Sequence, residues 1–101
     1  MKKFPIRKFL NWLKKQPDNR KFYYLNGHEI HAKFNNGCPI CMFIGECFPK
    51  MTNWGVQGNY IRVLNNDKAI SIPEKLNIVL KNLSYVFNTK ELKEAYECNN
   101  E

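Results

Sequence analysis

The stretch that decides the fold is residues 5–34, PIRKFLNWLKKQPDNRKFYYLNGHEIHAKF, because the hydrophobic spacing changes within it from helical to strand-like. Over residues 5–16 the apolar positions recur every third or fourth residue, which predicts an amphipathic helix. Pro5 suits the first turn of this helix and Pro17 ends it, because proline fixes φ and lacks a backbone N–H. The apolar stripe consists of Ile6, Phe9, Leu10 and Leu13.

A β-hairpin is predicted over residues 20–34. Asn26-Gly27 is a strong hairpin signal, since a type I′ turn needs positive φ at both of its central residues. Such a turn would pair Phe22 with His31 and Tyr23 with Ile30, and successive side chains would then point to opposite faces. We assign to the core Tyr23, Leu25, His28, Ile30, Ala32 and Phe34. The opposite face would carry Arg20, Phe22, Tyr24, Glu29, His31 and Lys33.

The rest of the chain alternates short helices with strands. A helix is predicted from Pro39 to about Phe48, a loop over residues 52–59, and a second hairpin from residues 60–64 and 68–72. Thr89 is the expected N-cap of a last helix. Pro73 opens the clearest helix, whose apolar stripe is Leu76, Val79, Leu80, Leu83, Val86 and Phe87. This order predicts a small α+β fold with three or four short helices and one or two antiparallel hairpins.

Length and composition fit a single domain, residues 1–101, with 44% hydrophobic and 14% aromatic residues. The net charge of +7 is unevenly distributed. Residues 1–33 contain nine Lys/Arg and two acids, whereas residues 34–101 contain seven of each. A one-sided positive field attracts nucleic acid, a membrane surface or an acidic protein face. The competing interpretation is a solvated basic face that has no dedicated partner.

We expect neither an export signal nor a membrane partner. Lys2 and Lys3 could open a signal peptide, but the cations between Arg7 and Lys15 interrupt its apolar core. No run approaches the ~20 apolar residues that span a bilayer. The expected location is therefore the cytoplasm, in which cysteines stay reduced. The cysteines concerned are Cys38, Cys41, Cys47 and Cys98.

The most specific local pattern is Cys38-Pro39-Ile40-Cys41, which opens a predicted helix. A helix N-terminus lowers the pKa of a cysteine, and redox-active dithiols occur at such positions. The four residues resemble the active-site turn of glutaredoxins and thioredoxins, and this resemblance implies thiol redox chemistry at Cys38 and Cys41. The parallel βαβ framework of those families is absent from the predicted elements. The alternative is that both cysteines are small buried side chains of the core.

Zinc is the second chemical candidate, since His28, His31, Cys38 and Cys41 are ligands of suitable type. On one strand, however, two histidines three residues apart would point to opposite faces. A set built on Cys38, Cys41 and Cys47 lacks a nearby fourth ligand. We therefore predict neither a metal nor another cofactor.

Catalytic patterns are missing from the sequence. There is no nucleophile elbow and no evident acid/base pair, and the Gly55–Gly58 segment has neither the spacing nor the following Lys-Ser/Thr of a phosphate-binding loop. We therefore expect that the chain is not an enzyme.

The third candidate is a basic and aromatic surface formed by the first third of the chain. Cations with interleaved aromatic rings can follow phosphates and stack on bases. The same mixture suits a protein interface, in which Trp, Tyr and Arg supply most of the binding energy. For Trp12 and Phe22, packing in the core is the slightly favoured alternative. The predicted binding residues are Arg7, Lys8, Trp12, Lys14, Lys15, Arg20, Lys21, Phe22 and Tyr24.

The order of elements resembles a loose group of small uncharacterised proteins from bacteria and their phages. The shared features are Phe9-Leu10-x-Trp12-Leu13, Pro17, Tyr24, Cys38-Pro39, Ile72-Pro73 and Thr89. The resemblance implies a phage accessory protein, and such proteins often inhibit host machinery. We therefore expect a non-catalytic binding protein of the host cytoplasm that inhibits a host protein or ribonucleoprotein complex, such as a CRISPR-type defence complex. The alternatives are direct nucleic-acid binding and thiol redox chemistry at Cys38 and Cys41.

Overall fold

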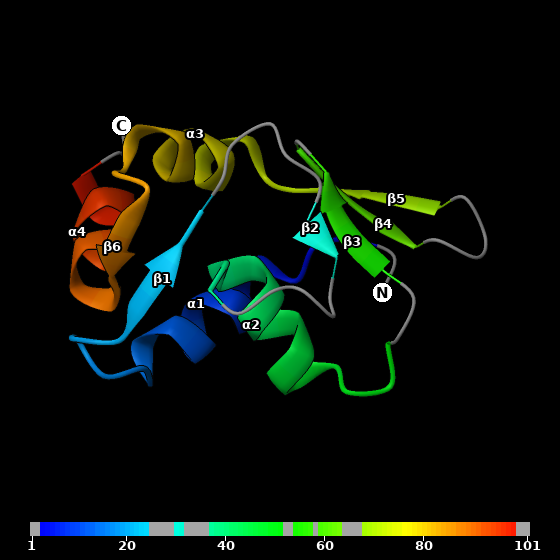
Figure 1. Cartoon of the computed structure of the whole chain (residues 1–101), viewed down its shortest axis with the longest axis horizontal. Helices are drawn as coiled ribbons and strands as arrows, with labels where there is room; N and C mark the ends of the chain where they lie inside the picture. The colour runs from blue at the N-terminus through cyan, green and yellow to red at the C-terminus, as the bar shows by residue number, and fades with distance from the viewer. Residues whose placement is uncertain are drawn as a thin grey trace.

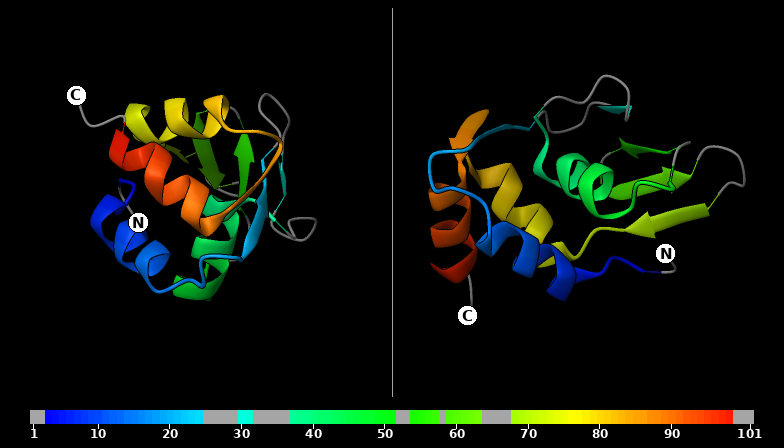
Figure 2. Two further views of the ribbon diagram at one scale, coloured as in Figure 1. Left: turned by 90° about the vertical axis from the view of Figure 1, so that its left-hand side faces the viewer. Right: turned by 90° about the horizontal axis from the view of Figure 1, so that it is seen from below.

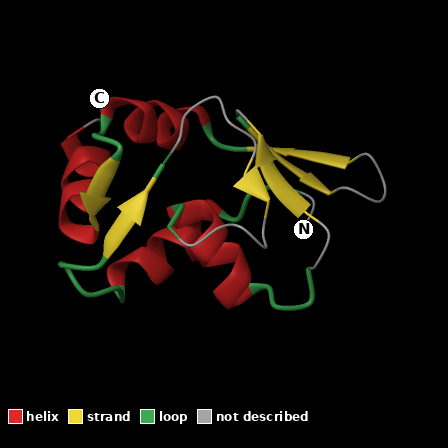
Figure 3. Cartoon of the chain, viewed as in Figure 1, coloured by secondary structure: helices red, strands yellow, loops and turns green. Residues whose placement is uncertain are grey.

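A computed structural model describes residues 3–24, 30–31, 37–51, 54–57, 59–63 and 68–98. Over these residues the chain forms four helices: α1 (Ile6–Lys14), α2 (Pro39–Cys47), α3 (Glu74–Asn82) and α4 (Thr89–Cys98) (Figure 3). An antiparallel sheet joins β1 (Lys21–Tyr23) to β6 (Val86–Asn88). A second antiparallel sheet, in the order β2-β3-β4-β5, contains β2 (Ile30–His31), β3 (Trp54–Gln57), β4 (Tyr60–Val63) and β5 (Lys68–Ser71). The predicted α+β class is confirmed.

The two sheets lie at opposite ends of the long axis of the molecule, whose extents are 36 × 26 × 24 Å (Figure 1). The four-stranded sheet occupies one end, and the two-stranded sheet with α4 occupies the other. Helices α1, α2 and α3 lie between them, an arrangement that the right-hand view of Figure 2 repeats. Helix α1 lies at the outside of the molecule, next to α2 and α4.

The core is a single cluster that draws residues from all four helices and both sheets. Its centre is aromatic. The Phe9 and Phe43 rings meet edge to face at 5.2 Å, and Trp12 lies 5.7 Å from Phe43. Phe22 of β1 packs on Phe87 of β6 at 6.1 Å. Aromatic side chains bury large areas and add favourable pair geometry, so these rings hold α1, α2 and the two-stranded sheet together.

The helices that open at prolines begin within a residue of where the sequence predicts them. Pro5 and Pro73 are the N-caps of α1 and α3, and Pro39 is the first residue of α2. The predicted end of α3 is wrong, because the helix stops at Asn82 and residues 86–88 form β6. The apolar period continues past the helix by coincidence, while the β-branched and aromatic residues there suit a strand.

The predicted first hairpin is wrong. β1 pairs with β6, in the register Phe22↔Phe87, and not with β2, which pairs with β3. The predicted turn at residues 26–27 lies outside the described residues, as do all of the side chains of the second predicted strand. The assignment of faces is inverted: Phe22 and Tyr24 are 0% and 7% exposed, whereas Tyr23 is 43% exposed. Alternate side chains of a strand point to opposite faces, and in β1 the face that packs on the core is the one that carries Phe22 and not Tyr23.

The second hairpin is confirmed, and it extends into a region predicted to be a loop. β4 pairs with β5 in the register Tyr60↔Ser71, while the turn that joins them lies outside the described residues. Residues 54–57 are a strand, not a loop, and pair with β4. The physical reason is alternation, since Trp54 and Val56 are both buried on the core side.

The N-cap of α4 is Asn88 rather than the predicted Thr89. The Asn88 side-chain oxygen accepts a hydrogen bond from the Glu91 N–H at 2.8 Å, and the Glu91 carboxylate accepts one from the Asn88 N–H at 3.1 Å. This reciprocal pair is a capping box. Thr89 is fully buried, and its N–H donates to the Arg20 carbonyl oxygen at 2.9 Å.

Candidate functional site

The outer side of α1 and its C-cap carry four cations, which we call the basic face and define as Arg7, Lys8, Lys14 and Lys15. All four side chains are exposed, and α1 contains no acidic residue. The Lys8 ammonium lies 4.5 Å from the centre of the Phe48 ring, a cation–π contact that orients it. Arg7, Lys14 and Lys15 form no ion pair with any described residue. Their charge therefore remains directed towards solvent.

Arg20 does not belong to this surface, although the sequence placed it among the binding residues. Its guanidinium donates to the Glu46 carboxylate at 2.8 Å and also to the Gln16 side chain. It lies 5.4 Å from the centres of both the Trp12 and Phe22 rings. These contacts hold the guanidinium against the fold and use two of its five N–H donors.

Glu46 is the polar centre of this cluster. It accepts hydrogen bonds from Arg20 and from the Trp12 indole N–H, the latter at 3.1 Å. The hydrogen bond from Arg20 lowers the pKa of the Glu46 carboxyl most strongly, the partial burial of the group opposes it, and the Trp12 hydrogen bond adds to the lowering. The two hydrogen bonds to Glu46, from Trp12 and from Arg20, thus fix α1, β1 and α2 relative to one another.

The three aromatic residues predicted for the binding surface are all buried. Trp12, Phe22 and Tyr24 are 7%, 0% and 7% exposed. For Trp12 and Phe22 the core alternative is confirmed, whereas the placement of Tyr24 on the surface is wrong. Of the nine predicted binding residues, the exposed ones are Arg7, Lys8, Lys14, Lys15 and Lys21.

An exposed aromatic surface does exist on the two-stranded sheet, and the sequence analysis missed it. We call it the tyrosine patch: Tyr23, Tyr85 and Val86, which are 43%, 53% and 40% exposed. The Tyr23 and Tyr85 rings contact each other with their centres 6.0 Å apart. Lys21 is exposed on the same strand face as Tyr23, because alternate residues of a strand share a face. The adjacent pair Tyr23-Tyr24 is a sequence signal for such a patch. Which of the two tyrosines is exposed, however, depends on the strand with which β1 pairs.

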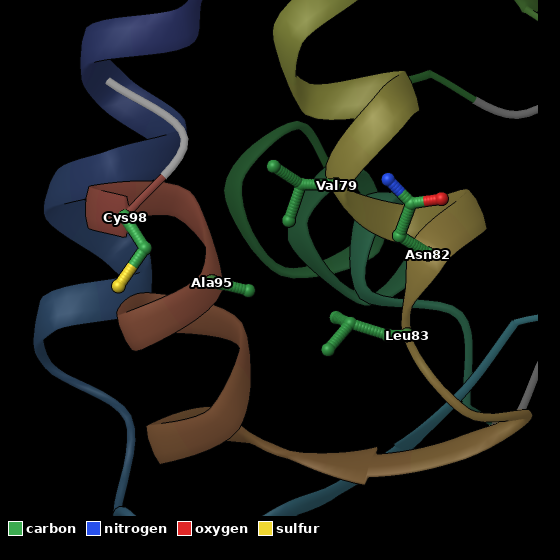
Figure 4. A pocket seen from close by; sticks show the side chains of 5 residues that line it. All are labelled: Val79, Asn82, Leu83, Ala95 and Cys98. Carbon is green, nitrogen blue, oxygen red and sulfur yellow. The ribbon is translucent and has the colours of Figure 1, made fainter. Parts of the chain in front are cut away.

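Two shallow grooves flank α4. One, of about 270 Å³, lies between α1 and α4 and is lined by Leu10, Leu13, Lys14, Lys93, Tyr96 and Glu97. The other, of about 200 Å³, lies between α3 and α4. Figure 4 shows Val79, Asn82 and Leu83 on one wall of this second groove and Ala95 and Cys98 on the other. Its lining is mainly apolar, and it brings together no acid and base that could act on a substrate.

Cys38 and Cys41 stand together at the start of α2. Cys38 is the N-cap, Pro39 follows at the first helical position, and the two cysteine side chains are 2% and 4% exposed. Burial opposes ionisation of the Cys38 thiol, but interactions with the Cys41 thiol and with the backbone N–H groups of Cys41 and Ile40 outweigh it and lower the pKa of Cys38. The Cys38 sulfur makes no full-strength capping hydrogen bond.

Tyr24 lies close to these two sulfur atoms. Burial raises the pKa of Tyr24 to about 12, and negative charge on Cys38 or Cys41 adds to the shift. The phenol therefore stays neutral near neutral pH, so no second negative charge opposes a thiolate at Cys38.

The described residues contain no group of three side chains that could hold a metal ion. The proposed histidine–cysteine zinc set includes His28, which lies outside the described residues. Cys38, Cys41, Cys47 and Cys98 are all reduced, with no disulfide between them. Within the described part of the chain, none of the helices has the length and apolar character needed to cross a membrane. No protein-family model, curated protein or solved structure matches the chain.

Proposed function

We propose that this chain is a non-catalytic binding protein that docks through its basic face on an acidic surface of a macromolecular partner. The observation that carries the proposal is the uniform charge of the outer side of α1, where the exposed cations have no acidic neighbour on the helix. Cations held on a rigid helix keep their spacing. A complementary surface is therefore attracted at long range and aligned on contact.

The partner that we propose is a protein surface rather than free nucleic acid. Three of the four cations of the basic face are lysines, which attract anions in general, whereas arginine provides the bidentate contacts that distinguish bases. Trp12 and Phe22, which could have stacked on bases, are buried. The exposed tyrosines instead suit a protein interface, where tyrosine is enriched among the residues that anchor a complex.

The resemblance to small phage proteins supports a narrower form of this proposal. In that form the chain acts in the cytoplasm of the host cell and inhibits a host protein or ribonucleoprotein complex, of which a CRISPR-type defence complex is the case to test first. The fold adds nothing to this choice, because one fold serves many functions.

A charge-reversal experiment tests the proposal. The basic-face variant combines Arg7→Glu, Lys14→Glu and Lys15→Glu, and it spares Lys8 because of its contact with Phe48. The control variant combines Lys50→Glu, Lys81→Glu and Lys90→Glu, which are exposed positions elsewhere, so both variants have the same net charge. Circular dichroism first establishes that both are folded.

The readouts are capture and inhibition. In host lysate treated with nuclease, we expect wild type and the control variant to retain a protein partner that the basic-face variant loses. In cells with CRISPR immunity, the same two proteins should permit phage infection and the basic-face variant should not. For free DNA we expect only weak, non-specific affinity, about 10⁻⁴–10⁻⁶ M at physiological salt. Capture that disappears on nuclease treatment, or full activity of the basic-face variant, would contradict the proposal.

A further inference from the structure

Cys38 and Cys41 form a pair of buried thiols that the docking proposal does not use. Cys38 is the N-cap of α2 and Cys41 is the third residue of the helix. A side chain at the N-cap faces the third residue of its helix, which is the relation that a capping box exploits. An interaction with the Cys41 thiol is among the causes that lower the pKa of Cys38, in agreement with this placement. The N-cap and the third helical residue thus bring the two side chains to the same side of the first turn of α2.

The two cysteines differ in nucleophilicity. The thiolate is the reactive form of cysteine, and a helix N-terminus stabilises it. Cys38 receives that stabilisation together with the interaction with the Cys41 thiol, and its pKa is lowered despite burial. Cys41 lies one turn inside the helix, so it is placed to react second.

We propose that Cys38 and Cys41 are a reversible dithiol–disulfide pair that is oxidised by small hydroperoxides. Burial sets the size of the oxidant. With the two side chains 2% and 4% exposed, small reagents such as hydrogen peroxide reach either sulfur far more readily than the disulfide of another protein does. Accessibility and thiolate character together determine which cysteines are oxidised.

The reaction balances in two steps. The Cys38 thiolate attacks one oxygen of the peroxide, the O–O bond breaks, hydroxide leaves, and Cys38 becomes a sulfenic acid. The hydroxide takes up the proton that the Cys38 thiol released on ionisation. The Cys41 sulfur then attacks the sulfenic sulfur, the S–S bond forms as the S–O bond breaks, and water leaves with the Cys41 proton. The thiols lose two electrons, the peroxide becomes water, and an external dithiol reverses the change by thiol–disulfide exchange.

The test uses the full chain with Cys47→Ser and Cys98→Ser as the background, which leaves only the proposed pair. Each background protein is treated with hydrogen peroxide and analysed by intact mass and peptide mapping. The background should lose the mass of two hydrogen atoms and regain it with dithiothreitol. Adding Cys41→Ser should stop the reaction at a Cys38 sulfenic acid that dimedone traps. Adding Cys38→Ser should slow thiol oxidation by at least about tenfold, because the thiolate is the nucleophile.

A pH profile separates this site from an ordinary thiol. We expect the oxidation rate of the background to reach its plateau at a lower pH than that of free cysteine, whose thiol has a pKa of about 8.5, since the pKa of Cys38 is lowered. The proposal is overturned if the background keeps its mass under conditions that oxidise Cys98 in wild type, or if Cys38→Ser reacts as fast as the background. Should Cys38→Ser fail to fold, the mass of the background alone decides.

Discussion

The Arg20 guanidinium lies 2.8 Å from the Glu46 carboxylate and joins the start of β1 to the last turn of α2. The same carboxylate accepts the Trp12 indole N–H, so one acidic side chain connects three elements. Arg20, which the sequence analysis predicted to be a surface binding residue, is thus a structural residue in the fold. Arg20 therefore contributes less to the exposed charge of this part of the molecule than Arg7, Lys14 and Lys15 do.

This ion pair predicts an acid-sensitive contribution to stability. The pKa of Glu46 is lowered in the folded state, so the contribution is present above the unfolded value of about 4.3 and is lost as pH falls through the folded value. We expect Glu46→Gln to lower the free energy of unfolding by no more than about 1 kcal/mol near neutral pH, because the carboxylate is 44% exposed. Urea unfolding at about pH 7 and about pH 3 measures the difference, which should shrink in acid.

The control for this prediction is Glu94→Gln, since Glu94 is exposed and forms no ion pair with a described residue. It should have little effect at either pH. A Glu46→Gln difference of equal size at both pH values would show that the charge of Glu46 contributes nothing.

The inverted faces of β1 predict losses of stability of very different size at two neighbouring positions. Phe22→Ala should lower the free energy of unfolding by about 3–5 kcal/mol, because it leaves a cavity in the core, and Phe22→Leu provides a milder version that keeps most of the volume. Tyr23→Ala should cost less than about 1 kcal/mol, since its ring is 43% exposed. Chemical denaturation measures all three. If Tyr23→Ala is the more damaging substitution, the face assignment of β1 is wrong.

Local signals predicted the helices well, and long-range pairing limited the rest. Proline placement and apolar period lie within a few residues of one another, so they located the starts of α1, α2 and α3. The partner of Phe22 is Phe87, far along the chain, and no local pattern reports such a contact. The apolar period that contains Val86 and Phe87 extended the predicted α3 and thereby concealed β6.

The candidate binding cations on the helix were correctly predicted to be exposed, whereas the candidates on the strand depended on long-range pairing. On an amphipathic helix the polar side is set by the period alone, which is why Arg7, Lys8, Lys14 and Lys15 are exposed as predicted. On a strand the exposed side depends on register and partner, so one wrong pairing exchanged Tyr24 for Tyr23. Sequence reasoning therefore identified the exposed cations of α1, whereas it placed Arg20 and Tyr24 wrongly on the binding surface.

The capping box of α4 predicts a specific dependence on Asn88. Asn88→Ala removes the acceptor for the Glu91 N–H and should lower the free energy of unfolding by about 0.5–2 kcal/mol. Asn88→Asp keeps an acceptor at the same place and adds a negative charge at the helix N-terminus, so it should remain close to wild type. Thermal or urea unfolding compares the two. Equal losses of stability in both variants would show that Asn88 is not the N-cap of α4.

Gly37 and Gly45 predict effects of opposite sign for the same substitution. A Cβ at Gly37 would lie 2.3 Å from the Tyr23 ring atom Cδ2 and 3.0 Å from Tyr23 Cβ and Cγ. The Tyr23 N–H donates to the Gly37 carbonyl oxygen at 2.7 Å, which holds the two backbones close together. Rotation of the ring cannot relieve the contact with Tyr23 Cβ, so we expect Gly37→Ala to cost about 1–3 kcal/mol. Gly45 is exposed inside α2 with nothing within 4 Å of the added atom, and Gly45→Ala should stabilise the protein by about 0.5–1 kcal/mol.

A double variant tests the cause of the Gly37 effect. Adding Tyr23→Ala to Gly37→Ala removes the ring and leaves only the contact between the two Cβ atoms. The double variant should therefore be more stable than the sum of the single losses implies, with a coupling of about 0.5–3 kcal/mol between residues in contact. Urea unfolding of the four proteins of this cycle gives that coupling directly. Additive losses would show that the cost at Gly37 arises from its own backbone, and the close approach of the 37–38 segment to β1 would no longer explain why glycine precedes Cys38.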